Sequence, residues 1–286
     1  MKGIILSGGS GTRLNPVTNV LNKQLLPIYN KPMIYYPLSV LMLMGIRDIL
    51  IITTPKDQHL FIDLLGDGGH IGCNITYKIQ EKPNGLAEAF IIGEEFIQND
   101  QVTLILGDNI FYGSGFIKNF KDQFNENYAT IFACRVSEPS NYGVVEFDST
   151  GKVISLEEKP TKPKSNYAVP GLYIYDNEVS SVAKAVKPSK RGELEITSIN
   201  KFYLNNNKLN VIKMKRGSVW FDTGSFDSMI KASSYIQAYE ESQQSLIGSI
   251  EEIAFNLGYI SSTELNLLAE KYSKNEYGKL LKRLLK

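Results

Sequence analysis

A glycine-rich loop directly behind the first predicted strand constrains this chain more than any other feature. The apolar run 1–6 is typical of a buried strand, and it leads into Gly8-Gly9-Ser10-Gly11-Thr12-Arg13. Glycines let backbone N–H groups wrap around an anion, because no Cβ stands in the way. Arg13 and, further on, Lys23 could then bind phosphate oxygens. The loop predicts a nucleoside triphosphate site, and its main alternative is a tight turn with solvated cations.

The loop matches neither of two familiar phosphate motifs. The dinucleotide fingerprint, if it began at Gly9, would require glycine at position 14, where the chain has Leu14. A P-loop would end in Gly-Lys-Ser or Gly-Lys-Thr, and no such triplet follows. Phosphate binding here would therefore use a third arrangement, and an NAD-dependent dehydrogenase is disfavoured.

The order of apolar runs and helical patterns indicates the fold class. Strands alternate with helices in the first half, which is typical of βαβ units and a parallel sheet. Strands are predicted at 1–6, 49–53, 74–79 and 102–106, and helices at 32–46, 58–65 and 86–97. Ligands of such sheets bind beyond the carboxyl ends of the strands. The loops 8–13, 80–85 and 107–109 leave strand ends, so we expect them to meet in one site.

The second half continues without a low-complexity linker, which favours one sheet with an elaborated second half over two separable domains. Strands are predicted at 131–136, 142–147, 153–157, 170–175 and 209–214, and helices at 178–185, 195–204, 226–239, 248–257, 262–271 and 276–286. The basic, amphipathic end at 279–286 could lie on a membrane surface. Its more common role is to dock an apolar face on the protein body or on a neighbouring subunit.

Composition narrows the function. A formal net charge of +1 argues against a general nucleic-acid binder. The two histidines, His59 and His70, give little support to a histidine-centred mechanism, and Cys73 and Cys134 lack metal-type spacing. We find neither a signal-peptide pattern nor the ~20-residue apolar run of a membrane span, so a soluble cytoplasmic protein is expected.

Two aspartates follow apolar runs. Asp108 comes after 102–106, and Asp222 comes after Val219-Trp220-Phe221. Mg²⁺ typically takes one or two carboxylates plus phosphate oxygens of a substrate, whereas an isolated Asp at a strand end is as often a turn or cap residue. Combined with the phosphate loop, the pair predicts a Mg²⁺ site.

Further charged groups lie in the second half. Lys159 and Arg191 could bind a second phosphate, and Glu158 could accept hydrogen bonds from sugar hydroxyls. Taken singly, each is more often a solvated surface residue.

Several long motifs together resemble the sugar-phosphate nucleotidylyltransferases. The motifs are 8–14, 23–29, 31–39, 106–111 and 191–197, and the similarity extends over essentially the whole chain. The resemblance implies a Rossmann-like three-layer α/β/α nucleotidyltransferase fold with a mixed, mostly parallel sheet. It also implies thymidylyl transfer from dTTP to α-D-glucose 1-phosphate with release of pyrophosphate, the first step of dTDP-rhamnose synthesis. A Mg²⁺ cofactor and a homotetramer are expected from the family.

The resemblance also implies roles for individual positions. The nucleotide positions are Leu6, Gly8, Gly11, Thr12, Arg13, Lys23, Gln80, Gly85 and Asp108, with Gln80 and Gly85 at the thymine. The sugar-phosphate positions are Asn109, Tyr142, Gly143, Glu158, Lys159, Val169, Arg191 and Trp220. Arg13 and Lys159 are the expected catalytic cations, and Asp108 and Asp222 the Mg²⁺ ligands. Residues 1–129 would form a nucleotide-binding half of a single domain, 130–240 a sugar-phosphate-binding half, and 241–286 a helical elaboration.

Two departures from the family pattern concern specificity and control. Glu81-Lys82-Pro83-Asn84 stands where the family often has Pro-Ser-Pro-Asp, although Gln80 and Gly85 remain. Asn256 stands where relatives usually carry an Arg of a secondary nucleotide site at the subunit interface, so feedback inhibition by dTDP-sugars is expected to be weak or absent. Two alternative functions stay open: a relative that uses UTP or another sugar 1-phosphate, and a non-catalytic nucleotide-sugar sensor.

Overall fold

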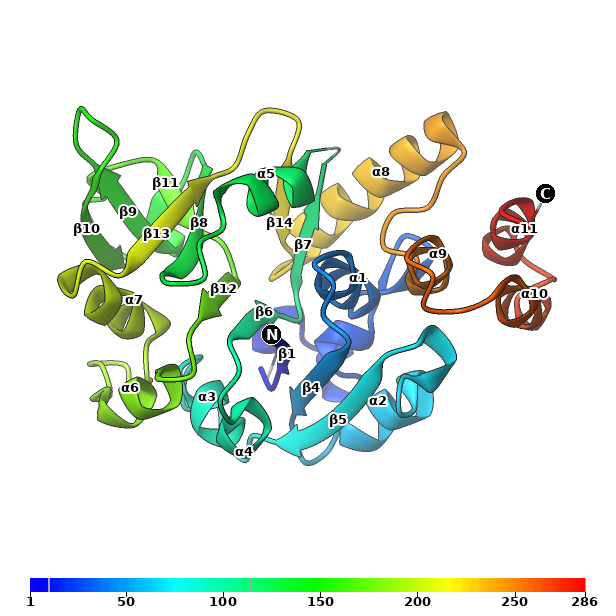
Figure 1. Cartoon of the computed structure of the whole chain (residues 1–286), viewed down its shortest axis with the longest axis horizontal. Helices are drawn as coiled ribbons and strands as arrows, with labels where there is room; N and C mark the ends of the chain where they lie inside the picture. Colours follow the sequence, from blue (N-terminus) through cyan, green and yellow to red (C-terminus); the bar gives the residue numbers. More distant parts are fainter. Residues whose placement is uncertain (10, 114, 286) are drawn as a thin grey trace.

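A ten-stranded sheet runs through the protein (Figure 1). The computed structural model describes residues 1–9, 11–113 and 115–285. The strands lie in the order β10 (Val153–Glu158), β9 (Gly143–Phe147), β11 (Tyr167–Val169), β8 (Ala129–Arg135), β12 (Leu172–Tyr175), β6 (Val102–Leu106), β1 (Lys2–Ser7), β4 (Asp48–Thr53) and β5 (Asn74–Ile79), with β13 (Leu209–Lys213) beside β8.

Strand direction shows how the two halves are joined. β5, β4, β1 and β6 pair in parallel, and so do β8 and β13. β12 is antiparallel to both β6 and β8, and β11 is antiparallel to β8. β9 is antiparallel to both β10 and β11. Of the ten strands, β10, β11 and β12 are therefore the reversed ones, and the predicted mixed, mostly parallel sheet is confirmed.

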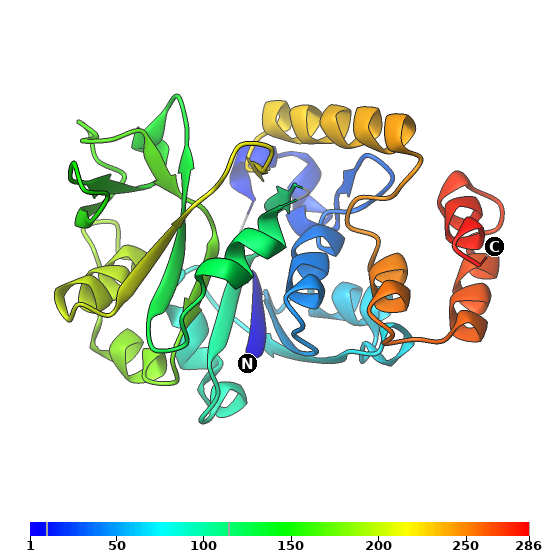
Figure 2. The same ribbon diagram turned by 45° about the horizontal axis from the view of Figure 1, so that its top comes forward.

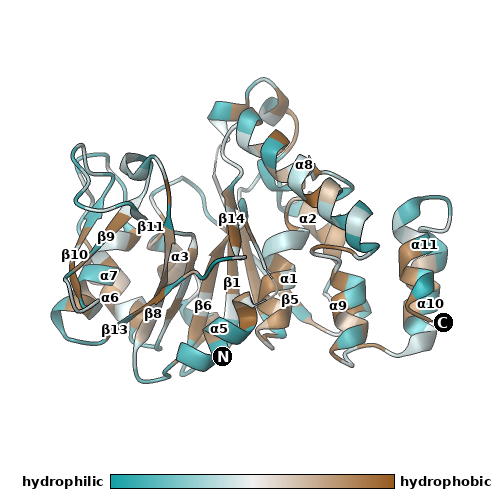
Figure 3. Ribbon diagram, turned by 90° about the horizontal axis from the view of Figure 1, so that it is seen from above, coloured by the Kyte–Doolittle hydropathy of each residue, from teal (hydrophilic) through white to brown (hydrophobic). Residues whose placement is uncertain are grey.

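Helices cover both faces of the sheet, because successive residues of a strand point to opposite faces. Ile4 and Leu6 of β1 belong to one apolar core, with α3 (Glu88–Ile92), α4 (Glu94–Ile97), α6 (Val179–Ala185) and α7 (Ile196–Asn205). Ile5 belongs to the core on the opposite face, with α1 (Tyr35–Leu43), α2 (Gln58–Leu65) and α5 (Phe116–Gln123). Figure 3 shows the apolar strands between these layers, so the predicted three-layer α/β/α fold is confirmed.

Several elements differ from the sequence prediction. The predicted helix 86–97 is divided into α3 and α4 at Gly93, whereas Pro37 lies in the first turn of α1, where proline is tolerated. Short pairs of strands were not predicted: β2 (Pro27–Ile28) with β3 (Lys31–Pro32), and β7 (Asn109–Tyr112) with β14 (Val219–Asp222). Single 3₁₀ turns occur at Thr12–Leu14, Val17–Asn19, Lys23–Leu25, Gly69–Ile71 and Pro139–Asn141.

The C-terminal helices pack on the protein body. α8 (Phe226–Gln243) leads into α9 (Ile250–Asn256), α10 (Ser262–Lys271) and α11 (Glu276–Arg283), and Figure 2 shows α9 beside α1. Tyr277 and Leu281 of α11 are buried in the core that also contains α1. The basic end thus docks its apolar face, as expected. None of the helices in the described ranges is long and apolar enough to cross a membrane.

A buried ion pair fastens α8 to the hairpin that follows the phosphate loop. Lys31 Nζ lies 2.8 Å from Glu240 Oε1, and both side chains are almost fully buried. Glu240 also accepts hydrogen bonds from Asn30 Nδ2 and from the backbone N–H of Ile247. The Lys31 ammonium lies above the ring of Tyr277, 5.8 Å from its centroid. This pair connects the hairpin, α8 and α11.

Replacing one partner of this pair should be far more harmful than replacing both. In Glu240→Leu the Lys31 ammonium stays buried without its carboxylate, and we expect the free energy of unfolding to fall by ~3–5 kcal/mol. The double variant Lys31→Met/Glu240→Leu should recover most of that loss. Urea denaturation measures the free energy of unfolding of both variants. Equal losses in the single and the double variant would contradict the assignment of a buried ion pair between Lys31 and Glu240.

Candidate active site

The three predicted loops meet at the carboxyl ends of β1, β5 and β6. β1 and β6 are neighbours, and the N–H of Gly107 donates to the carbonyl of Leu6 at 2.9 Å. Gln80 follows β5, and its side chain reaches back to Gly8. Together these loops line a cavity of about 200 Å³, here called the smaller cavity, whose walls include Leu6, Gly8, Gln80, Gly85 and Asp108.

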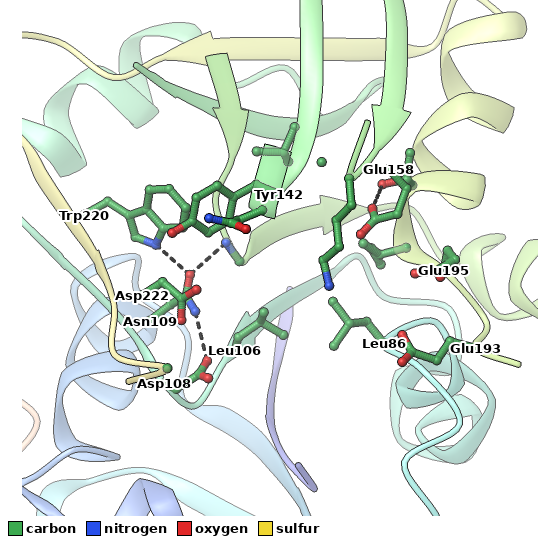
Figure 4. A pocket seen from close by; sticks show the side chains of 18 of the residues that line it. Leu86, Leu106, Asp108, Asn109, Tyr142, Glu158, Glu193, Glu195, Trp220 and Asp222 are labelled. Atoms are coloured by element: carbon green, nitrogen blue, oxygen red, sulfur yellow. Dashed lines mark hydrogen bonds between the residues drawn. The ribbon is translucent and has the colours of Figure 1, made fainter. Parts of the chain in front are cut away.

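A larger cavity of about 760 Å³ adjoins the smaller one, and Asp108 and Glu193 line both. All eight predicted sugar-phosphate residues line it: Asn109, Tyr142, Gly143, Glu158, Lys159, Val169, Arg191 and Trp220. The strand register explains part of this gathering, because Glu158 of β10 and Val169 of β11 both pair with Gly143 of β9. Arg13, from the phosphate loop, also lines this cavity. So does Asp222, which lies near Asn109 and Asp108 in Figure 4.

Other residues singled out from the sequence line neither of the two cavities. Gly11 precedes the first 3₁₀ turn, and Thr12 begins that turn with an exposed side chain. Lys23 is buried, and its ammonium donates to Asp108 Oδ2. Asn256, at the end of α9, is exposed.

Two carboxylates meet at the junction of the cavities. β14 pairs with β7 so that Asp222 stands opposite Asn109, and therefore next to Asp108. Burial and the charge of Asp108 raise the pKa of Asp222 above its ordinary value. Burial acts in the same direction on Asp108, but the ammonium of Lys23 brings the pKa of Asp108 below its ordinary value.

This carboxylate pair could hold a divalent cation that is also bound by substrate phosphates. Thr223 fixes the geometry, because its N–H and its hydroxyl both donate to the carbonyl of Asp108, at 3.0 and 2.7 Å. No group of three or more His, Cys, Asp or Glu side chains forms a metal site within the described ranges. A pair of carboxylates suits Mg²⁺, which commonly keeps waters and takes its other oxygens from phosphates.

The four predicted phosphate-binding cations divide into two kinds. Lys23 is paired with Asp108, and Arg191 is paired with Glu195 and Glu193, whose oxygens lie 3.0 and 2.9 Å from Nη2. In the described part of the chain, Arg13 and Lys159 form no ion pair. Lys159 also has a left-handed backbone, with φ of 41°. Such strain in a non-glycine residue costs ~1–3 kcal/mol and is concentrated at functional sites.

The side chain of Gln80 has a fixed orientation. Its Nε2 donates to Glu88 Oε2 at 2.7 Å and to the carbonyl of Gly85 at 3.3 Å. A carboxylate and a carbonyl only accept hydrogen bonds, so the amide nitrogen must face them. Gln80 Oε1 therefore faces Gly8, on the side of the smaller cavity, as an acceptor.

Three residues at the site escaped the sequence analysis. Gln24 lines the smaller cavity and is 3% exposed, and its Oε1 has no hydrogen-bond partner within the described residues. A polar residue between Lys23 and two leucines was the signal that could have identified it. Glu88 orients Gln80, and Thr197 donates to Glu158, but no local pattern distinguishes either from an ordinary helix residue.

Adjacent glycines of the loop should respond differently to alanine. A Cβ on Gly8 would lie 2.4 Å from Gln80 Oε1, whereas a Cβ on Gly9 would meet nothing within 4 Å. Because Gln80 is buried and held by two hydrogen bonds, we expect Gly8→Ala to lower the free energy of unfolding by ~1–3 kcal/mol. Gly9→Ala should stay within ~0.5 kcal/mol of the wild type. Guanidinium denaturation of the two variants measures this difference. Equal free energies of unfolding would show that Gln80 is not held as described.

Comparisons with known proteins identify the relatives of this chain. The nucleotidyl transferase family model matches residues 2–239. A glucose-1-phosphate thymidylyltransferase from Neisseria meningitidis serogroup A is 54% identical over 287 residues, covering 100% of both chains. Another from Mycobacterium tuberculosis is 52% identical and is covered to 99%, with 100% of this chain aligned.

Two solved structures are similar in fold. One is described as a glucose-1-phosphate thymidylyltransferase from Bacillus anthracis in complex with a sucrose; its TM-score is 0.75 at 42% identity, over 82% of this chain and 94% of that one. The other is a UDP-glucose pyrophosphorylase complexed with UDP-glucose, with a TM-score of 0.72 at 25% identity, over 84% of this chain and 98% of that one.

Proposed function

The chain belongs to the nucleotidyl transferase family, and on that premise we propose that it transfers a thymidylyl group from dTTP to α-D-glucose 1-phosphate. The observation that carries the proposal is the pair of adjoining cavities, which share Asp108. The smaller cavity suits a nucleobase. The larger one suits a sugar phosphate, because it is lined by Arg13 and Lys159, which form no ion pair among the described residues. The two substrates would thus meet beside Asp108 and Asp222.

The reaction needs no protein nucleophile. A phosphate oxygen of glucose 1-phosphate forms a bond to the α-phosphorus of dTTP, and the bond between that phosphorus and the bridging oxygen to the β-phosphate breaks. The electron pair leaves with pyrophosphate. The attacking oxygen already carries charge, so neither a serine nor a histidine has to activate it. Neither His59 nor His70 is among the described residues that line the two cavities. Positioning and charge neutralisation would supply the catalysis.

The cations of the site would receive the phosphates. Arg13, at the end of the glycine loop, and Lys159, across the larger cavity, are the proposed catalytic cations. Arg191 would hold the sugar phosphate, and Lys23 the nucleotide phosphates, once each exchanges a carboxylate partner for a phosphate. Asp108 and Asp222 are the proposed ligands of Mg²⁺, which when bound would neutralise negative charge on the phosphates.

The smaller cavity supports a base with an imide edge. Gln80 Oε1 is an acceptor, so it suits the N3–H of thymine or uracil and not the bare N3 of cytosine. Thymine and uracil differ by one methyl group, which is worth only ~1–3 kcal/mol in an apolar pocket. Some use of UTP is therefore expected.

We also propose, on family grounds, that the protein is a cytoplasmic homotetramer whose product enters dTDP-rhamnose synthesis. With Asn256 in place of the usual arginine, feedback by dTDP-sugars should be weak or absent.

A pyrophosphate-release assay tests the proposed function. With glucose 1-phosphate present, dTTP should be the best of dTTP, UTP, CTP, ATP and GTP, and turnover should require Mg²⁺. Asp108→Asn and Asp222→Asn should each lower turnover by about a hundredfold or more while part of the dTTP affinity survives, because metal neutralisation is worth several kcal/mol in the transition state. A preference for a purine triphosphate would exclude the thymidylyl assignment. Full turnover in both variants would exclude the metal assignment.

Glu88 offers a sharper test of base recognition. A glutamine at this position can donate as well as accept, so Glu88→Gln removes the shorter of the two hydrogen bonds that fix the Gln80 amide. The amide can then turn round at the cost of its longer hydrogen bond, 3.3 Å, to the carbonyl of Gly85. We expect the kcat/KM ratio of CTP to dTTP to rise by about tenfold, the equivalent of one hydrogen bond. Glu95→Gln is the matched control, since Glu95 is exposed and pairs only with Lys78 among the described residues. An unchanged ratio in Glu88→Gln would show that Glu88 does not set the orientation.

A further inference from the structure

Asn109 is a buried residue in the wall of the larger cavity, next to Asp108 in the chain and opposite Asp222 in the β7–β14 pair. Hydrogen bonds fix the orientation of its side-chain amide. Asn109 is 3% exposed and begins β7. Its Oδ1 accepts hydrogen bonds from Trp220 Nε1 at 2.6 Å and from the N–H of Gly171 at 3.0 Å. An indole N–H and a backbone N–H can only donate, so the amide oxygen must face them. The amide nitrogen is thereby directed at Asp108, and Nδ2 lies 2.9 Å from Asp108 Oδ1 (Figure 4).

Trp220 is the other end of this connection. Its ring lines the larger cavity and packs edge-on against Tyr142, with ring centroids 5.0 Å apart. The same side chain therefore forms a cavity wall and, through its N–H, holds Asn109. The cavity wall is connected to the Asp108 carboxylate by two consecutive hydrogen bonds.

The hydrogen bonds of Asn109 leave little for a ligand. Its oxygen already has two donors and one of its two amide hydrogens is directed at Asp108, so one donor remains for a sugar. With Asp108 Oδ1 held by Asn109, the other oxygen, Oδ2, is the one that faces a cation, and in this structure it meets the ammonium of Lys23. The hydrogen bond from Asn109 thus determines that Oδ2 of Asp108 is the oxygen that faces a cation.

We propose that Trp220 and Asn109 are positioning residues that orient Asp108 for a divalent cation and couple its orientation to the wall of the larger cavity. The inference rests on the metal role proposed for Asp108. Groups that fix the ligands of a metal ion commonly change its affinity by 10–100-fold when removed. A merely structural role for Asn109 would change stability and leave cation affinity unaltered.

The single tryptophan provides the readout. Mg²⁺ alone is titrated into the full-length protein while Trp220 emission is recorded, and Mn²⁺ affinity is measured separately by electron paramagnetic resonance. The wild type should show a saturable emission change. In Asn109→Ala that change should be lost, and Mn²⁺ affinity should fall by about tenfold. Trp220→Phe, which keeps a ring but lacks the N–H, should weaken Mn²⁺ roughly threefold, a smaller effect because Gly171 still holds Asn109.

Asn119→Ala is the matched control, because Asn119 is a buried asparagine of α5 whose amide donates to the carbonyl of Lys213, away from both cavities. It should lower the melting temperature and leave Mn²⁺ affinity and the emission change as in the wild type. Equal Mn²⁺ affinity in Asn109→Ala and the wild type would overturn the proposal, as would an emission change that persists in Asn109→Ala. Failure of the wild type to use dTTP in the pyrophosphate assay would overturn the thymidylyl assignment instead, because the cation measurements need no nucleotide.

Discussion

The backbone pairing of β7 with β14 is the constraint on which the site depends. Asp108 and Asp222 repel each other when both are ionised, and burial increases the cost. Freely moving side chains would separate. Here the register places Asp222 opposite Asn109, and Thr223 holds the carbonyl of Asp108 with two hydrogen bonds. The strand pair thus keeps two like charges together. A cation placed between the two carboxylates would stabilise this arrangement.

Lys23 and Arg191 explain how a nearly neutral protein can prepare a site for two polyanions. Their charges are balanced internally, by Asp108 in one case and by Glu195 and Glu193 in the other. A strongly positive empty cavity would attract any anion, whereas paired cations favour a ligand that can replace the carboxylate. Arg13 and Lys159 line the larger cavity without an ion pair among the described residues, so under the proposed function they would attract the phosphates directly.

The sequence was most informative where chain topology decides the outcome. The loops after β1, β5 and β6 had to emerge at one edge because parallel strands share a direction, and they line one cavity. The pairing of β7 with β14 was not predictable in this way, because two four-residue strands carry no signal for a partner about a hundred residues away. Trp220 and Asn109 are 111 positions apart, and the orientation of Gln80 depends on the carboxylate of Glu88 packing against its amide nitrogen. Such side-chain geometry follows from packing, which a local pattern does not encode.

The reversed strand β12 is what makes the two halves a single site. Because it runs antiparallel to β6, its first residues lie beside the last residues of β6, and Leu106 donates to the carbonyl of Gly171 at 2.9 Å. The N–H of the same glycine holds Asn109 Oδ1. A Cβ at this position would lie 2.5 Å from the Leu106 side chain and 2.8 Å from Asn109 Oδ1, so close contact requires glycine. Any shift of the second half against the first would therefore disturb Asn109, and with it the carboxylate at which the two cavities join.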